Sequence, residues 1–258
     1  MAQQDRTSAA MKSVVNILNV SRFIRIYDDL AAQKGIKLSV GFDFDKYVTI
    51  TSALPTKKRT YPNFRPDRSP IKPGQGYWMI GLDKHNDVAL VEAARLYDLQ
   101  DSNFASNLES LRAFYADPAM HAHPQDRCRC TAPTAREITG KVAYHGDFWL
   151  RKDFRGQGMP EIMAAVLRGI SFAMWKPDFV VGLAERWLLS KGVLAQYGHA
   201  HYEEGGSVLH LVEENIMDDD LLVWLTSEEL QRLVYHHEKN ELSASPRDPS
   251  PSAERQAI

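Results

Sequence analysis

The sequence predicts an α/β fold, a sheet covered by helices, and three observations carry this prediction. Residues 140–175 begin with an apolar, aromatic-rich run, pass through a basic turn with two glycines, and continue with apolar residues at helical spacing. Residues 77–97 contain two apolar runs around the polar turn 83–87, which is the pattern of a β-hairpin. Further short strands are expected at 179–183, 208–212 and 221–225.

Composition narrows the class of protein. The chain has 258 residues, of which 44% are hydrophobic and 25% charged, as in ordinary globular proteins with a sizeable core. A formal net charge of −2 argues neither for a nucleic-acid-binding protein nor for a membrane-surface protein. No run approaches the roughly 18 apolar residues of a membrane span, and residues 1–24 lack the apolar core of a signal peptide. Two cysteines, at 128 and 130, make no disulfide framework, so the simplest location is a reducing cytoplasm.

The N-terminal third predicts helices, a strand and a long loop. An apolar stripe at helical spacing covers residues 11–34 and ends before Gly35, so residues 1–35 form an N-terminal helical extension. A strand is expected at 36–40. It is followed by a short helix capped by Asp43 or Asp45.

Residues 55–76 differ in composition from the rest of the chain, because they are rich in proline and in basic residues. Five prolines exclude a regular helix or a central strand. Six basic residues stand against one acidic residue, Asp67, with Tyr61 and Phe64 among them. A solvated loop anchored by its aromatic residues is the favoured interpretation. A site for an acidic or phosphorylated substrate, or for nucleic acid, stays open.

After the hairpin, a helix is expected over 108–115, ending at Asp117-Pro118, and an irregular insertion over 117–136. The insertion clusters residues of metal-ligand type, namely His121, His123, Cys128 and Cys130. Their spacing is not one of the usual structural zinc patterns, so no metal is predicted and exposed loop residues are expected.

The C-terminal third predicts a helix over 185–197, two strands around Gly205-Gly206, and a last helix through His237. Thr226 and Glu229 have the spacing of a capping box at the start of that helix. Residues 239–258 are rich in Pro, Ser and charge, and we expect a disordered tail.

The basic turn has the features of a phosphate cradle. Gly156 and Gly158 carry no Cβ, so a phosphate can approach the free backbone N–H groups at the start of the following helix. Arg151, Lys152 and Arg155 add positive charge. A Walker A sequence is absent, and the dinucleotide fingerprint lacks its third glycine.

The segment 150–159, Leu-Arg-Lys-Asp-Phe-Arg-Gly-Gln-Gly-Met, resembles the acetyl-CoA-binding motif of the GNAT (Gcn5-related) N-acetyltransferases. Pro160 departs from that motif, which has Gly or Ala at this position. The resemblance implies a GNAT-type mixed, mostly antiparallel sheet with flanking helices and a splayed pair of parallel strands. It assigns residues 36–238 to a GNAT-like domain.

The resemblance also implies a function and a site. The reaction would move an acetyl group from acetyl-CoA to the amine of a small molecule or peptide. Contacts to the cofactor would come from Phe148, Trp149, Leu150, Arg155, Gly156, Gln157, Gly158 and Met159. The catalytic candidates are Glu92, Asp147 and Tyr197, with His145 as a further base, and Gly146 is expected to mark a bulge.

A rival interpretation is a non-catalytic acyl-CoA-binding regulatory protein with the same fold. Pro160 favours it, as does Tyr197, which directly precedes Gly198 whereas the family tyrosine lies several residues earlier. The acceptor amine, and whether the chain forms a homodimer, stay open.

Overall fold

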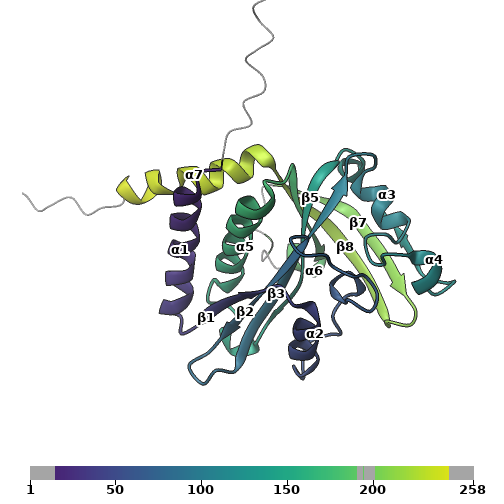
Figure 1. Ribbon diagram of the computed structural model, residues 1–258, viewed down its shortest axis with the longest axis horizontal. Helices are drawn as coiled ribbons and strands as arrows, with labels where there is room; N and C mark the ends of the chain where they lie inside the picture. Colours follow the sequence, from purple (N-terminus) through teal and green to yellow (C-terminus); the bar gives the residue numbers. More distant parts are fainter. Residues whose placement is uncertain (1–14, 191–193, 195–200, 244–258) are drawn as a thin grey trace, which may run out of the picture.

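The computed structural model describes residues 15–190, 194 and 201–243 (Figure 1). The strands are β1 (Lys37–Gly41), β2 (Gly76–Leu82), β3 (Val88–Leu99), β4 (Arg127–Arg129), β5 (Gly140–Leu150), β6 (Phe179–Glu185), β7 (His201–Leu211) and β8 (Ile216–Thr226). The α-helices are α1 (Ile17–Gln33), α2 (Phe44–Ser52), α3 (Phe104–Glu109), α4 (Pro118–His121), α5 (Met159–Trp175), α6 (Trp187–Ser190) and α7 (Ser227–Ser243). Three short 3-10 helices are η1 (Pro62–Phe64), η2 (Pro133–Arg136) and η3 (Lys152–Phe154).

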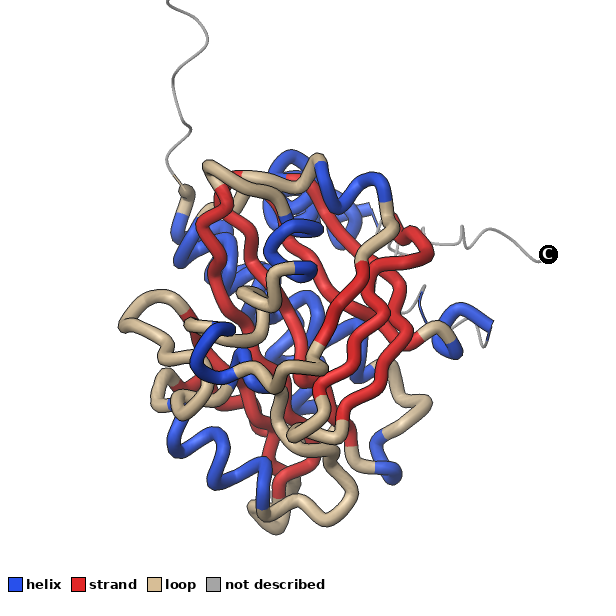
Figure 2. Tube along the Cα trace, turned by 90° about the vertical axis from the view of Figure 1, so that its right-hand side faces the viewer, coloured by secondary structure: helices blue, strands red, loops and turns tan. Residues whose placement is uncertain are grey.

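The described strands form one sheet in the order β1-β2-β3-β5-β6-β8-β7-β4. Its neighbouring strands are antiparallel, except that β5 and β6 run parallel. The predicted fold class, a mixed and mostly antiparallel sheet with flanking helices, is therefore confirmed. Figure 2 shows the strands as one layer, with loops and short helices in front and the long helices behind.

Two apolar clusters lie on the two faces of the sheet. One contains side chains of α1, α5 and α7, including Phe23, Leu167 and Val234. The other contains Tyr47 of α2 and Phe64 of η1, with residues of the segment 104–138. Side chains of β5 alternate between the two clusters, so this central strand connects both halves of the core.

Several predicted ends and caps are confirmed. Asp43 caps α2 by accepting from the N–H of Lys46, and α1 ends before Gly35. Thr226 and Glu229 form the capping box at α7: Glu229 accepts from the Thr226 N–H and Thr226 Oγ1 accepts from the Glu229 N–H. The helix α7 runs to Ser243, past the predicted end at His237, and residues 244–258 of the predicted tail lie outside the described residues.

The segment between β3 and β5 differs from prediction. A helix is present at 104–109 rather than 108–115, because Asn103 caps it and Leu111 has a left-handed φ of 61° that stops it. The segment 117–136 is not wholly irregular. It contains α4, η2 and β4, and β4 pairs with β7 through Cys128 and Leu209.

Two predictions for the C-terminal third are wrong. β7 is one strand, because the glycine pair at 205–206 forms an irregularity inside it rather than a break. Glu185 ends β6, where it pairs with Asp220, and does not begin a helix. The described part of α6 covers 187–190, and most of the predicted helix beyond it lies outside the described residues. No described helix meets the length and hydropathy needed for a membrane span.

Candidate active site where two parallel strands part

The parallel strands β5 and β6 pair over four residues only. The pairs run from Val142 with Phe179 to His145 with Gly182. Beyond this point β5 pairs with β3 and β6 pairs with β8, and no pairing joins the two strands among the described residues. The predicted splayed pair is therefore present, and one edge of β5 from residue 146 onward has no strand partner among the described residues.

A β-bulge lies immediately after the last pair. The register between β3 and β5 shifts between Val91 and Ala93, and Asp147 has a left-handed φ of 57°. Gly146 is required here, because a Cβ would lie 2.8 Å from the ring of Tyr144. The bulge that Gly146 predicted is confirmed, and it turns the Asp147 side chain toward α2.

Asp147 is buried and fully engaged. Its Oδ2 accepts from the Tyr47 hydroxyl at 2.7 Å, and its Oδ1 accepts from Lys57 Nζ at 2.8 Å. Burial raises the pKa of Asp147, while Lys57 and the hydrogen bonds oppose that shift. Because both carboxylate oxygens have donors, Asp147 is placed to fix the bulge rather than to accept a substrate proton.

Glu92 has a different environment, although it lies on β3 directly opposite the bulge. Its side chain is buried, and Oε2 has no hydrogen-bond partner among the described residues. Burial raises its pKa to about 8, and the positive charge of Arg168 on α5 opposes the shift. A carboxyl group with a pKa near neutrality is suited to accept and release protons.

His145 belongs to the α5 side of the sheet. Its Nε2 lies 2.9 Å from Ser171 Oγ, and Tyr77 contacts the same hydroxyl at 2.9 Å. Burial lowers the pKa of His145 to about 3, so its ring is neutral near pH 7. This arrangement makes His145 part of the contact between β5 and α5.

The glycine turn follows β5 directly. Gly156 and Gly158 are exposed and have φ of 73° and 75°, and a Cβ added at either would meet no atom within 4 Å. The backbone N–H groups of 156–159 make no backbone hydrogen bond to any described residue. Gly158 caps α5, and Pro160 lies in its first turn. Unengaged N–H groups at a helix start form an anion site.

The basic side chains around the glycine turn have different partners. Arg151 is held by Asp83 at 2.6 Å and Asp153 at 2.8 Å, so its charge is already paired. Arg155 Nε donates to the carbonyl of Leu150 at 3.2 Å, which closes the turn against the strand. Lys152 is exposed beside them. The turn is therefore braced by arginine side chains.

The remaining predicted cofactor residues lie on β5 and at the start of α5. Trp149 is buried, and its Nε1 donates to Thr56 Oγ1 at 3.2 Å. Phe148 and Leu150 pack toward the α5 side, as does Met159. Gln157 is exposed and donates to the Asp153 carbonyl at 2.7 Å. Tyr197 lies outside the described residues.

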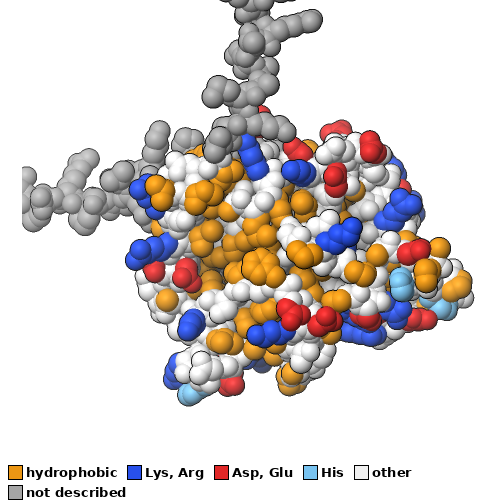
Figure 3. All heavy atoms as spheres, viewed as in Figure 1, with side chains coloured by type: hydrophobic (Ala, Val, Ile, Leu, Met, Phe, Trp, Pro, Cys, Tyr) orange, Lys and Arg blue, Asp and Glu red, His pale blue; other side chains and the backbone are white. Residues whose placement is uncertain are grey.

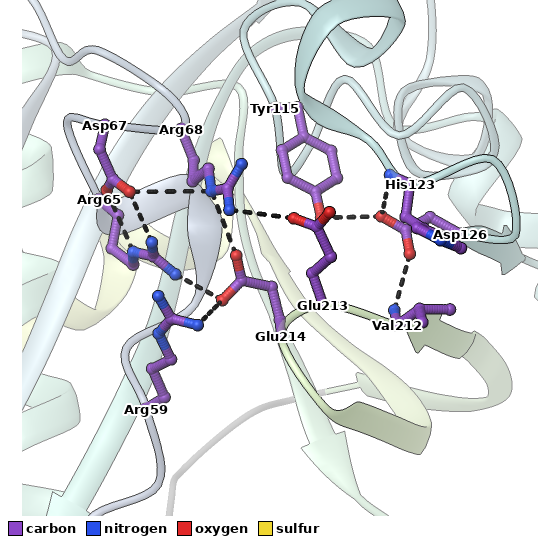
Figure 4. A network of polar contacts seen from close by, with 10 residues as sticks. All are labelled: Arg59, Arg65, Asp67, Arg68, Tyr115, His123, Asp126, Val212, Glu213 and Glu214. Carbon is purple, nitrogen blue, oxygen red and sulfur yellow. Dashed lines mark hydrogen bonds and ion pairs between the residues drawn. The ribbon is translucent and has the colours of Figure 1, made fainter.

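Residues 55–76, which we call the strap, are not a solvated basic loop. Phe64 and Arg65 are buried, and arginines 59, 65 and 68 all contact the buried carboxylate of Glu214 in the β7–β8 turn (Figure 4). Asp126 of the segment before β4 binds the same turn through the N–H of Val212. The predicted aromatic anchors are present. Solvation is wrong for Arg65, which is buried against carboxylates, whereas Lys58 and Arg59 are exposed as expected.

The strap gives little support to nucleic-acid binding. Its arginines are paired, and on the face drawn in Figure 3 basic side chains are scattered among acidic and apolar ones. Cys128 of β4 and Cys130 just after it are buried rather than exposed as predicted, because both pack into the apolar cluster on the α2 side of the sheet. No group of three or more His, Cys, Asp or Glu side chains positioned for a metal ion occurs in the described part of the chain.

Sequence reasoning missed Tyr47 and Lys57, whose side chains donate to Asp147. In the sequence, Tyr47 lies in the short helix predicted after Asp43, and Lys57 is one of six basic residues in the predicted loop 55–76. Nothing local distinguishes Lys57 from Lys58. Only the folded strap shows that Lys57 is buried.

No family model and no curated protein sequence matches the chain. Solved N-acetyltransferases are similar to it. Arabidopsis thaliana NAA60 in complex with acetyl-CoA has 11% identity and a TM-score of 0.40, over 74% of this chain and 98% of that chain. The ribosomal-protein-S5-alanine acetyltransferase from Vibrio fischeri has 12% identity and a TM-score of 0.38, over 76% and 95%. An acetyltransferase of the GNAT family from Staphylococcus aureus has 8% identity and a TM-score of 0.40, over 74% and 99%.

Proposed function

We propose that this chain transfers an acetyl group from acetyl-CoA to an amine. The observation that carries the proposal is the parting of β5 and β6 after His145 and Gly182, directly before a glycine turn with unengaged N–H groups. An open strand edge followed by an anion site suits a ligand with an extended, amide-bearing arm and a pyrophosphate. Acetyl-CoA has both.

The turn would hold the pyrophosphate. Backbone N–H groups of Gly156, Gln157, Gly158 and Met159 are available, and the positive end of the α5 dipole lies beside them. Arg155 and Lys152 would add charge at the exposed rim. Pro160 supplies no N–H, so the donors come from the residues before it.

The arm of the cofactor would run along β5. From residue 146 to 150 this strand pairs on one side only, with β3. Its other edge offers backbone groups to the amides of pantetheine, at Phe148, Trp149 and Leu150, in the manner of an added strand. The thioester would then lie near the bulge at Asp147.

Acetyl transfer needs a deprotonated amine, a polarised thioester and a proton for the leaving thiolate. We assign the base to Glu92, whose raised pKa and unpartnered oxygen favour proton acceptance, acting through water. Asp147 would position the bulge through Tyr47 and Lys57. Tyr197 would protonate the thiolate. The acceptor is the amine of a small molecule or peptide.

Thiol release tests this function. The purified chain is mixed with acetyl-CoA and a panel of small amines and peptides, and free CoA is measured. The proposal expects release above the rate without acceptor for at least one amine, and a large loss of that rate in Glu92→Gln. Binding of CoA without release for any acceptor in the panel would favour the non-catalytic acyl-CoA-binding protein instead.

A further inference from the structure

Three acidic side chains share the α2 face of the sheet beyond the point where β5 and β6 part. Asp220 of β8 pairs with Glu185 at the end of β6 and with Ser207 of β7. Because side chains alternate along a strand, Asp218 lies on the same face as Asp220. Leu222, two residues further along β8, belongs to the apolar cluster on the α2 side, which identifies this face. The three carboxylates therefore lie on one face, next to the end of the β5–β6 pairing.

Asp220 is a buried acid without a counter-ion. It is 6% exposed, and its one side-chain hydrogen bond from the described part of the chain comes from Ser207 Oγ at 3.3 Å. Lys58 is ion-paired with Glu185 and Asp218, but no described basic side chain is ion-paired with Asp220. Burial and then the negative charge of Asp218 raise the pKa of Asp220 to about 7. A buried carboxyl group in such surroundings is stabilised in its charged form by a cation that binds next to it.

The hydroxyl of Tyr144 on β5 lies among the same carboxylates. The residue is 9% exposed, and its ring packs against Phe64 and Tyr97 with centroid distances of 6.0 and 6.1 Å. Within the described part of the chain the hydroxyl has no hydrogen-bond partner. Burial, Tyr97 and then the negative charge of Asp220 raise the pKa of Tyr144, so the hydroxyl keeps its proton. An unpartnered hydroxyl on a buried residue is free to bind a ligand.

This hydroxyl also lies beside the first β5 residue beyond the pairing with β6. A Cβ added at Gly146 would lie 3.1 Å from the Tyr144 hydroxyl oxygen. Tyr61 of the strap donates to Asp218 and holds that carboxylate on the same face. Oxygens of Asp220, Asp218 and Tyr144 can each accept a hydrogen bond, and an ammonium group has three donors and no acceptor. The arrangement therefore suits an alkylammonium group.

We propose that Asp220, Asp218 and the Tyr144 hydroxyl bind an alkylammonium group, and that the acceptor is an aliphatic diamine that places its second charge there. The acceptor role rests on the proposed acetyl transfer, in which the thioester lies near the bulge after Gly146. The other amine of the diamine would then face the thioester. Cation binding itself does not depend on that reaction.

Calorimetric titration with 1,4-diaminobutane, in the absence of acetyl-CoA, measures the cation site. The parent is compared with Asp220→Asn, Tyr144→Phe and the control Asp219→Asn. Asp219 is adjacent in sequence but lies on the other face of β8, where its side chain is 54% exposed and ion-paired with Arg186. Asp220→Asn removes a buried charge without a counter-ion, and Tyr144→Phe removes a hydroxyl without a partner. Both variants should therefore melt no lower than the parent.

Asp220→Asn should bind the diamine at least about tenfold more weakly than the parent, because it loses a charge-assisted hydrogen bond. Tyr144→Phe should bind about two- to tenfold more weakly, as expected for one neutral hydrogen bond. Asp219→Asn should bind as the parent does. The site would be overturned by equal affinity in all four proteins, or by a parent that binds no diamine at tens of millimolar. An equal loss in the two aspartate variants would also overturn it, because the attraction would then be general.

Thiol release from acetyl-CoA tests the acceptor role separately, with 1,4-diaminobutane and butylamine as the two amines. The parent should show a kcat/KM at least about tenfold higher for the diamine, since only the diamine has a second charge for Asp220. Asp220→Asn should lose this preference and Asp219→Asn should keep it. Equal kcat/KM for the two amines in the parent would overturn the acceptor assignment. If the diamine binds as predicted while no acceptor releases thiol, the cation site stands and the acetyl transfer fails.

Discussion

Lys57 Nζ lies 2.8 Å from Asp147 Oδ1, and the two side chains are almost fully buried. This ion pair joins the strap to the β-bulge, which lies where the pairing between β5 and β6 ends. Because neither charge reaches water, each depends on the other for its solvation. The local shape of the sheet where β5 and β6 part therefore depends on a lysine 90 residues from Asp147 in the chain.

Removing that lysine should be costly. Lys57→Met leaves Asp147 buried without its counter-ion, and we expect a loss of about 3–5 kcal/mol in the free energy of unfolding. The measurement is urea denaturation at pH 7. The double variant Lys57→Met/Asp147→Asn, which removes both charges, should recover a large part of the loss, and Lys58→Met should cost less than about 1 kcal/mol. Equal losses in the two single lysine variants would contradict the buried pair.

Glu92 predicts a pH dependence of stability. Its folded pKa of about 8 lies above the ordinary 4.5, so the folded state holds a proton that the unfolded chain releases between these values. Stability is therefore lost as pH rises from about 4.5 to 8. Glu92→Gln lacks this penalty, and its stability relative to the parent should improve by about 2–5 kcal/mol between pH 4 and 8.5. Denaturation curves at the two pH values measure the change. A pH-independent difference would show that Glu92 ionises normally.

The turn between β7 and β8 offers a matched pair of carboxylates. Glu214 is buried beneath three arginines, whereas the Glu213 side chain is 54% exposed and, within the described part of the chain, is ion-paired with Arg68 alone. Glu214→Gln should lower the free energy of unfolding by about 3–5 kcal/mol, because the buried Arg65 loses a counter-ion. Glu213→Gln should cost less than about 1 kcal/mol. Thermal melts of both variants measure this difference in stability. Similar melting points would contradict the network in Figure 4.

Much of the fold could be predicted because its signals are local. The hairpin β2–β3, the glycine turn and the capping box at α7 each follow from residues adjacent in sequence. The failures are positions where distant contacts decide. β4 is three residues long and exists because β7 offers an edge to it, and Gly205 sits inside β7 because the strand continues beside β8. Neither partner is visible in a local pattern.

In the candidate site, too, features set by local sequence could be predicted and features set by distant contacts could not. The glycine turn and the bulge at Gly146 could be predicted, because glycine marks positions that need a positive φ or close contact. The roles of the acidic residues could not. Glu92 and Asp147 are both carboxylates on central strands, and only the folded chain gives one of them two donors and leaves the other with an unpartnered oxygen. Burial and partners determine proton chemistry here.

Binding of CoA at the glycine turn is the central claim, and two glycines in the same backbone conformation test it. Gly158 and Gly74 have φ of 75° and 81°, and a Cβ would meet nothing within 4 Å at either. Alanine at each position should therefore cost a similar 1–2 kcal/mol or so of stability through backbone strain. Of these two glycines, only Gly158 lies in the glycine turn before α5.

Calorimetric titration of CoA into the parent, Gly158→Ala and Gly74→Ala is the most direct measurement. Each lost hydrogen bond to phosphate is worth about 1.5–3 kcal/mol, so Gly158→Ala should bind at least about tenfold more weakly than the parent. Gly74→Ala should bind as the parent does. An absence of heat for the parent at millimolar CoA, or equal affinity in all three proteins, would contradict a cofactor site at this turn.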